Sequence, residues 1–203
     1  MNEYRNLLAT CAGSINISIG GEIDLDFLRA LYEMRPRRLA FVVPRMFFTC
    51  DLGGFTHPLF ESVTHLDLYH ESGLQEDDID LNWETWSELA SIPVLTHLAL
   101  SHSIACSILS QVVSQCRRLA VTIVAAYPWE REVSVRYSQN LGSADARVVV
   151  MVLSADYNGD WELGARGGED FWIRAETFVN RKRAGEIDTS CYLLDEGTDQ
   201  MTV

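Results

Sequence analysis

The chain has 203 residues, of which 47% are hydrophobic and 22% are charged, and its formal net charge is −13. This composition supplies a folded core and excludes a disordered chain, while no apolar run approaches the roughly 20 residues of a membrane helix. The acidity also argues against nucleic acid and anionic membranes as partners, because such surfaces select clustered Lys and Arg.

A short motif recurs along the chain. Two copies share the pattern Thr-His-Leu-x-Leu-x-His, in SVTHLDLYHES at 62–72 and in VLTHLALSHS at 94–103. Weaker copies extend the series, so that its anchor residues are Ile17, Leu39, Leu66, Leu98, Leu119 and Val148, 21 to 32 residues apart. Leucine-rich repeats of 20–29 residues with insertions have this spacing.

Segments with helical periodicity lie between the anchors. We expect helices after Asp24, after Asn82 and after Ser103, each of which can cap a first turn. The clearest helix is predicted over 169–183, where acidic residues occupy the first turn and basic residues the last. Its apolar stripe consists of Phe171, Trp172, Ala175, Phe178 and Val179.

Alternating strands and helices predict an α/β fold with a mainly parallel sheet. We expect an irregular leucine-rich-repeat-like solenoid with helices on the convex side, in a single domain over 1–187, followed by an acidic flexible tail over 188–203. A compact, doubly wound sheet is the alternative. Strands in chain order favour the solenoid, and a reversal in strand order favours the doubly wound sheet.

Two segments carry a resemblance to a known family. The run Leu95-Thr-His-Leu-Ala-Leu100, followed by a helix ending in Cys-Arg-Arg-Leu119, resembles the leucine-rich-repeat-like regions of F-box-associated proteins of mushroom-forming fungi. The stretch from Ala144 to Val179, with DWELGARGGEDFWIRAETFV at its end, is similar to the closing unit of those proteins. The resemblance implies a repeat fold used for protein contacts. Family members that join ubiquitin ligases carry an F-box before the repeats, and residues 1–13 are too short for one, so we do not expect the ligase-adaptor role to carry over.

A polar stripe is predicted on the concave face of the solenoid. Residues that precede the anchor leucines alternate with them and therefore point away from the covering helices. In this column the sequence places Arg38, His65, His97, Arg118 and Arg147. We expect this stripe to bind an acidic or polar protein partner, although repeats also reuse residues without a function.

Other site patterns are incomplete. Both Asp78-x-Asp-x-Asn82 and Asp156-x-Asn-x-Asp160 begin like a calcium loop, but tryptophan replaces the required glycine in each. The glycines at 164–168 match no phosphate-binding motif and are expected in a tight turn. Four histidines without a nearby Cys or carboxylate make a weak zinc site. We therefore predict no enzyme activity, no cofactor and no metal.

The runner-up function is a small-molecule pocket at the carboxyl ends of the strands, near Tyr69, His70, Ser101 and His102. Five widely spaced cysteines without a CxxC pair indicate reduced thiols and a cytoplasmic protein, with a nuclear location as the alternative. The strand at 15–19 has little to cover its edge, which suggests either a homodimer through this edge or a segment upstream.

Overall fold

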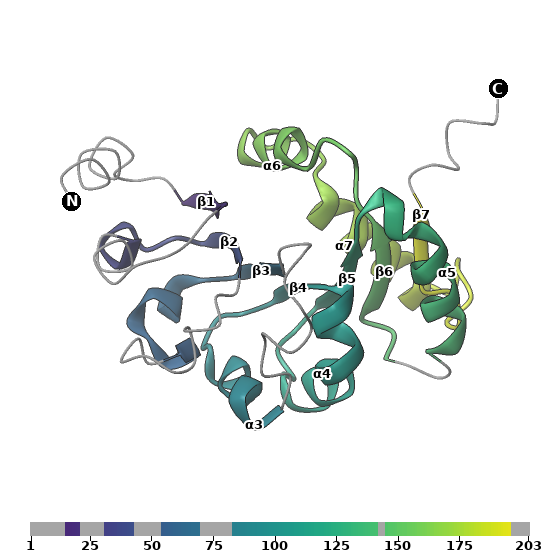
Figure 1. The fold of residues 1–203 in the computed structure, drawn as a ribbon, viewed down its shortest axis with the longest axis horizontal. Coiled ribbons are helices and arrows are strands. Elements are labelled where there is room, and N and C mark those ends of the chain that lie inside the picture. Colours follow the sequence, from purple (N-terminus) through teal and green to yellow (C-terminus); the bar gives the residue numbers. More distant parts are fainter. Residues whose placement is uncertain (1–14, 21–30, 43–53, 70–82, 142–144, 196–203) are drawn as a thin grey trace. The chain divides into compact units, whose positions relative to one another are not determined.

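The computed structural model describes residues 15–20, 31–42, 54–69, 83–141 and 145–195 (Figure 1). The chain forms two compact units. Unit 1 comprises residues 1–96 and 103–118, and unit 2 comprises residues 97–102 and 119–203. Each unit is described separately.

Strands and helices alternate along most of the described chain (Figure 1). Unit 1 holds β1 (Asn16–Ile19), β2 (Arg38–Val42), β3 (His65–Tyr69), α3 (Trp83–Trp86) and nearly all of α4 (His102–Gln115), together with the short 3-10 helices η2 (Gly54–Thr56), η3 (Pro58–Ser62) and η5 (Ser87–Ser91). Unit 2 holds β4 (His97–Ser101), β5 (Val121–Ala126), η6 (Pro128–Glu130), α5 (Arg131–Asn140), β6 (Val148–Val152), α6 (Tyr157–Ala165), α7 (Phe171–Arg183) and β7 (Leu193–Asp195).

The strands of unit 1 pair in parallel and in chain order. Ile17 lies opposite Leu39, and Leu39 lies opposite Leu66, so the first three predicted anchors share one register. Leu39 and Leu66 are both buried. Parallel pairing in this register therefore places the predicted anchors of neighbouring strands side by side.

The strands of unit 2 also pair in parallel and in chain order, but one predicted anchor is wrong. Leu98 lies opposite Thr122, and Thr122 lies opposite Val148. The strand therefore uses the apolar run from Val121, and Leu119 precedes it. With Thr122 in place of Leu119, the anchors of unit 2 are separated by 24 and 26 residues. The α/β class with parallel strands is thus confirmed in both units.

Both faces of the central strands in unit 2 are buried. Every residue of β4, β5 and β6 is buried, including both alternating sets of side chains. Helix α7 packs on the face that carries His97, because that ring contacts Trp172 of α7. His97 alternates with Leu98, so α7 covers the face opposite the anchor leucine. The prediction that helices lie only on the convex side is wrong in this unit.

Two α-helices and one strand of unit 2 were not predicted. Helices α5 and α6 follow β5 and β6, and strand β7 pairs in parallel with β6. Leu193 to Asp195 fall within the expected flexible tail, but in the structure they extend the sheet. Tyr192, just before them, is buried. The folded part of the chain therefore continues beyond residue 187.

Two predicted helices agree closely with the structure. Helix α4 begins at His102 and buries Ile104, Ile108 and Val112, while α7 begins at Phe171. The Asp170 carboxylate caps α7 by accepting the Ile173 N–H. Cys116 is buried, whereas Cys106 on α4 is exposed. The predicted caps Asp24 and Asn82 lie outside the described residues.

Candidate functional site

The predicted stripe begins in unit 1 with two neighbouring residues. Arg38 and His65 are direct partners across β2 and β3, and both are half-buried. The His65 ring nitrogen Nδ1 lies 2.9 Å from the Thr64 hydroxyl. The structure therefore brings these two predicted residues together at the amino-terminal ends of their strands.

His97 is not on an exposed surface. Only 8% of the residue is accessible to solvent, and its ring meets Trp172 edge to face, with 6.0 Å between centroids. Its Nε2 lies 3.9 Å from a carboxylate oxygen of Glu176, which is also on α7. Helix α7 occupies the face on which a partner was expected, so the predicted exposure of His97 is wrong.

The last two stripe residues bind the backbone of their own unit. Arg118 lies in a turn of unit 1, outside the strand column, and its guanidinium donates to the carbonyl of Pro93. In unit 2, Arg147 donates to both carboxylate oxygens of Asp145, at 2.8 and 2.7 Å, and to the Leu119 carbonyl at 3.2 Å. The hydrogen bond from Arg147 is the main cause that lowers the pKa of Asp145.

Two more cationic side chains lie at the amino-terminal ends of β5 and β6, which we call the amino-terminal edge of unit 2. Arg183 donates to the carbonyl of Ala120, and Lys182 donates to that of Val148 at 3.5 Å. Lys182 is 2% exposed, and its ammonium lies 4.0 Å from the centroid of the Tyr192 ring. Its pKa is lowered because burial disfavours the charged amine. We call Arg147, Lys182 and Arg183 the amino-edge clamp, since they hold the chain where β5 and β6 begin.

The residues predicted to line a pocket are divided between the two units, so the pocket stays a prediction. In unit 1, the Tyr69 hydroxyl donates to the Ile19 carbonyl at 2.7 Å, and His70 lies outside the described residues. In unit 2, Ser101 is buried, and the His102 ring contacts Tyr137 at 4.9 Å. The polar side chains of Tyr69 and His102 are thus engaged within their own units.

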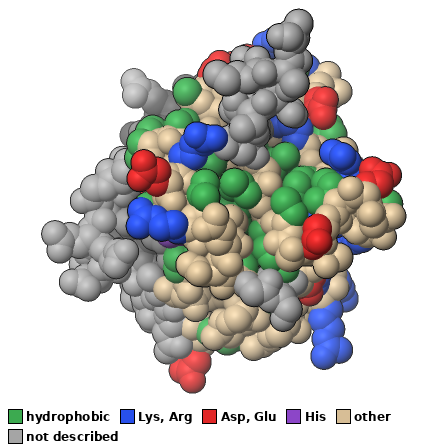
Figure 2. Space-filling model, turned by 90° about the vertical axis from the view of Figure 1, so that its right-hand side faces the viewer, with side chains coloured by type: hydrophobic (Ala, Val, Ile, Leu, Met, Phe, Trp, Pro, Cys, Tyr) green, Lys and Arg blue, Asp and Glu red, His purple; other side chains and the backbone are tan. Residues whose placement is uncertain are grey.

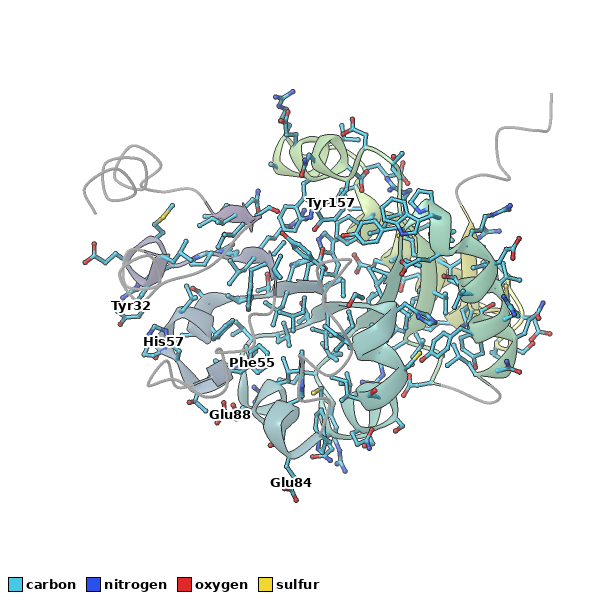
Figure 3. The ribbon with its side chains drawn as sticks, in the orientation of Figure 1. Tyr32, Phe55, His57, Glu84, Glu88 and Tyr157 are labelled. Atoms are coloured by element: carbon cyan, nitrogen blue, oxygen red, sulfur yellow. The ribbon has the colours of Figure 1, made fainter. Side chains whose placement is uncertain are left out.

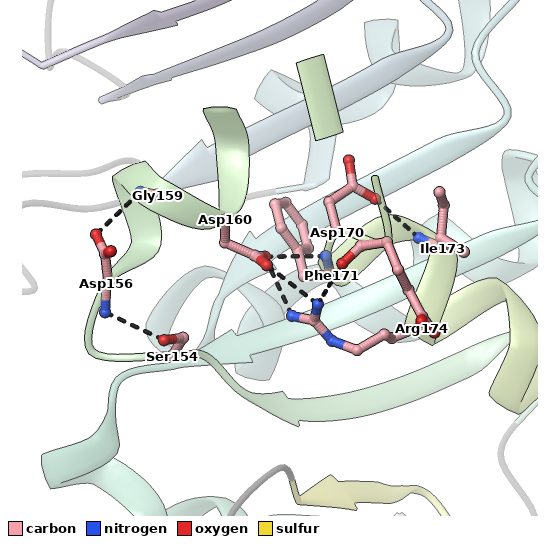
Figure 4. Close-up of polar contacts among 9 residues, drawn as sticks. Ser154, Asp156, Gly159, Asp160, Asp170, Phe171, Ile173 and Arg174 are labelled. Atoms are coloured by element: carbon pink, nitrogen blue, oxygen red, sulfur yellow. Dashed lines mark hydrogen bonds and ion pairs between the residues drawn. The ribbon is translucent and has the colours of Figure 1, made fainter. Parts of the chain in front are cut away.

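The acidic residues around α6 are structural. Asp156 caps α6 by accepting the Gly159 N–H, and Asp160 accepts from Arg174 at 3.0 and 3.1 Å (Figure 4). Asp160 also accepts the Phe171 N–H and so joins α6 to α7. A Cβ atom at Gly164 would lie 1.9 Å from the Asp170 carboxylate. Close packing of these helices therefore explains this glycine.

Polar groups near the aromatic core of unit 1 also support the backbone. Glu88 accepts the N–H of Phe55 at 3.0 Å, and Nδ1 of His57 accepts the N–H of Leu59 at 3.1 Å (Figure 3). The proton of the neutral His57 ring is then on Nε2. Burial lowers the pKa of His57. Across the described residues, no group of three or more His, Cys, Asp and Glu side chains is placed to hold a metal ion.

An aromatic pair with one exposed ring lies just after the carboxyl-terminal end of β5. Trp129 is 71% exposed, and its ring stacks on Tyr127 with 4.6 Å between centroids and an interplanar angle of 9°. Val133, one helical turn further, is 44% exposed. We call residues 127–130 the aromatic turn. Hydrophobic side chains also occur among charged ones on the surface in Figure 2.

The aromatic turn is held in place by its own hydrogen bonds. The Tyr127 N–H donates to the Glu130 carboxylate at 2.8 Å, and the Glu130 N–H donates to the Tyr127 carbonyl at 2.9 Å. Ser134 adds a bond from its hydroxyl to the Glu130 carbonyl at 3.0 Å. Pro128 fixes its own φ angle at the start of η6. Trp129 is therefore exposed on an ordered turn.

The residues of this turn are not periodic, so apolar spacing did not predict it. The sequence signal that could have indicated the turn is the run Tyr-Pro-Trp, which directly follows a buried strand. Binding sites in parallel sheets lie at the carboxyl ends of the strands.

None of the helices in the described part of the chain is long and apolar enough to cross a bilayer. No protein-family model, curated protein or solved structure matches the chain.

Proposed function

We propose that the chain is a protein-interaction module without catalytic activity, built on a leucine-rich-repeat-like arrangement. Support for the repeat comes from unit 1, where Ile17, Leu39 and Leu66 occupy equivalent positions of parallel neighbours. Stacked repeats produce this order, since each strand pairs with the strand of the next repeat. The irregular spacing of the anchors fits repeats that carry insertions.

The aromatic turn is the observation that carries the proposal. Residues that dominate protein interfaces are enriched in Trp, Tyr and Arg. Trp129 and Tyr127 form a stacked pair with one ring largely in solvent, and the exposed Arg131 follows them. Because the turn is already ordered, binding there loses little conformational entropy.

The predicted stripe contributes less to this proposal. Arg147 is engaged by Asp145 and His97 is buried under α7, so neither offers its polar group to a partner surface. Arg118 is exposed and Arg38 is half-buried. A binding role for the stripe stays a prediction, and it can be compared directly with that of the aromatic turn.

Affinity capture from the native cell, quantified by mass spectrometry, tests the proposal. We expect specific partners to fall about tenfold or more with Trp129→Ala, in the range of an interface hot spot. Trp129→Phe should restore part of the capture, because it keeps a stacked ring. Val94→Ala changes another exposed apolar side chain and should leave capture unchanged.

Circular dichroism of each variant separates lost binding from lost folding. If folded Trp129→Ala captures the same partners as the natural chain, the aromatic turn is not the interaction site. If Arg118→Glu abolishes capture while Trp129→Ala has no effect, the predicted stripe is the binding surface. Either result would overturn the assignment of function to Trp129.

A further inference from the structure

The ring of Trp129 has one occupied face. Tyr127 stacks against it at 9° from parallel, and yet 71% of the residue is exposed. Two nearly parallel rings cover one face of each other, so the second face of the indole is open to solvent. That face is rich in π electrons and, among the aromatic side chains, attracts cations most strongly.

Charge favours a cationic occupant. The chain has a net charge of −13, which attracts basic partners over long range. Within and next to the aromatic turn, Glu130 is half-buried and Glu132 is exposed. Arg131 and Arg136 lie on α5 together with Glu132, and Arg136 donates to the carbonyl of Glu132.

The shape of the site favours arginine among cationic side chains. A guanidinium is planar and stacks on an aromatic face, whereas an ammonium is a compact and strongly hydrated charge. Val133, 44% exposed one turn along, provides apolar surface for the methylene groups of such a side chain.

We infer that the open face of Trp129 receives an arginine side chain from a basic segment of a protein partner. This inference rests on the proposed function, because it names the chemistry of the partner at the same site. The guanidinium lies flat on the indole, and its charge is attracted by the net charge of −13 on the chain.

Two synthetic peptides test this directly with the full chain. One has the sequence Gly-Arg-Gly-Arg-Gly-Arg-Gly, and the other replaces each arginine with citrulline, which has the same shape but no charge. The chain contains five tryptophans, so an ¹H–¹⁵N spectrum gives five indole signals. Trp129→Ala identifies the signal of Trp129 by its loss.

We expect the arginine peptide to shift the Trp129 indole signal and to bind the natural chain about tenfold more tightly than the citrulline peptide. Trp129→Ala should weaken binding of the arginine peptide by about five- to thirtyfold, and Trp129→Phe should weaken it less. Equal affinity for both peptides, unchanged affinity in Trp129→Ala, or no binding at millimolar concentration would overturn the inference.

The two proposals fail in different ways. If cellular capture depends on Trp129 but the peptides do not distinguish arginine from citrulline, the interaction site stands and its proposed ligand is wrong. If capture does not depend on Trp129, the interaction site itself is wrong, whatever the peptides show.

Discussion

Side chains at the amino-terminal and carboxyl-terminal ends of the strands in unit 2 have different roles. At the amino-terminal edge, Arg147, Lys182 and Arg183 each donate to a backbone carbonyl near the start of a strand. At the carboxyl-terminal edge, the Tyr127 N–H donates to the Glu130 carboxylate and orders the aromatic turn, while Trp129 is largely in solvent. Arg147, which the sequence placed in the binding stripe, is thus engaged within its own unit, whereas Trp129 is available for contact.

The largest effect on stability is expected at the amino-edge clamp. Arg147→Ala removes three hydrogen bonds and leaves the Asp145 carboxylate without its main partner. We expect a loss of about 2 kcal/mol in the free energy of unfolding, the range for breaking charge-assisted, partly buried bonds. Urea denaturation measures it.

Arg166→Ala is the matched control for this experiment. Arg166 and Glu162 form an exposed pair one helical turn apart, and its loss should cost about 0.5 kcal/mol or less. If Arg147→Ala lowers the free energy of unfolding no more than Arg166→Ala does, the amino-edge clamp does not stabilise unit 2. The comparison between the two edges would then fail.

A second prediction concerns the pH dependence of Lys182, the only lysine of the chain. Burial lowers its pKa in the folded state below the ordinary 10.5, so the unfolded chain holds this proton to higher pH. Stability should therefore rise with pH between the folded-state pKa and 10.5 because of this group. The rise should be absent in Lys182→Met, as measured by urea denaturation at several pH values.

Tyrosine and cysteine side chains also titrate in this range, so the difference between the two proteins is the informative quantity. A difference that stays constant across the pH series would mean that Lys182 keeps an ordinary pKa. It would also mean that the amine is less buried than its place against Tyr192 indicates.

A small effect on stability is expected at the carboxyl-terminal edge. Trp129→Ala removes a ring that is mostly in solvent, so the free energy of unfolding should change by only about 0.5 kcal/mol. A loss above about 2 kcal/mol, as found for core aromatics, would indicate that the ring packs inside the unit. The same urea series measures this value.

The sequence predicted those parts of the fold whose periodicity is strong. Helix α7 and the shared register of Leu39 and Leu66 follow from apolar spacing alone. Helix α5 gives no such signal, because the residues it buries are Ser134 and Ser138. The register of β5 was misjudged because Arg-Arg-Leu119 imitates an earlier copy of the motif, whereas burial selects the run that starts at Val121.

The predicted site depended on contacts that spacing does not encode. Alternation along a strand places His97 and Leu98 on opposite faces of the sheet. It does not indicate that α7, which begins more than 70 residues later, covers the face with His97. The pairing of Arg147 with Asp145 is local, and the sequence shows the two residues two positions apart. Trp129 lies in a turn, where exposure depends on the whole fold.

Hydroxyl-radical footprinting of the chain with and without a captured partner tests the central claim most directly. Trypsin cleavage after Arg118 and Arg131 releases residues 119–131, in which Trp129 is the only tryptophan. We predict strong oxidation of Trp129 in the isolated chain and marked protection in the complex. Equal oxidation of Trp129 in both states would contradict the account.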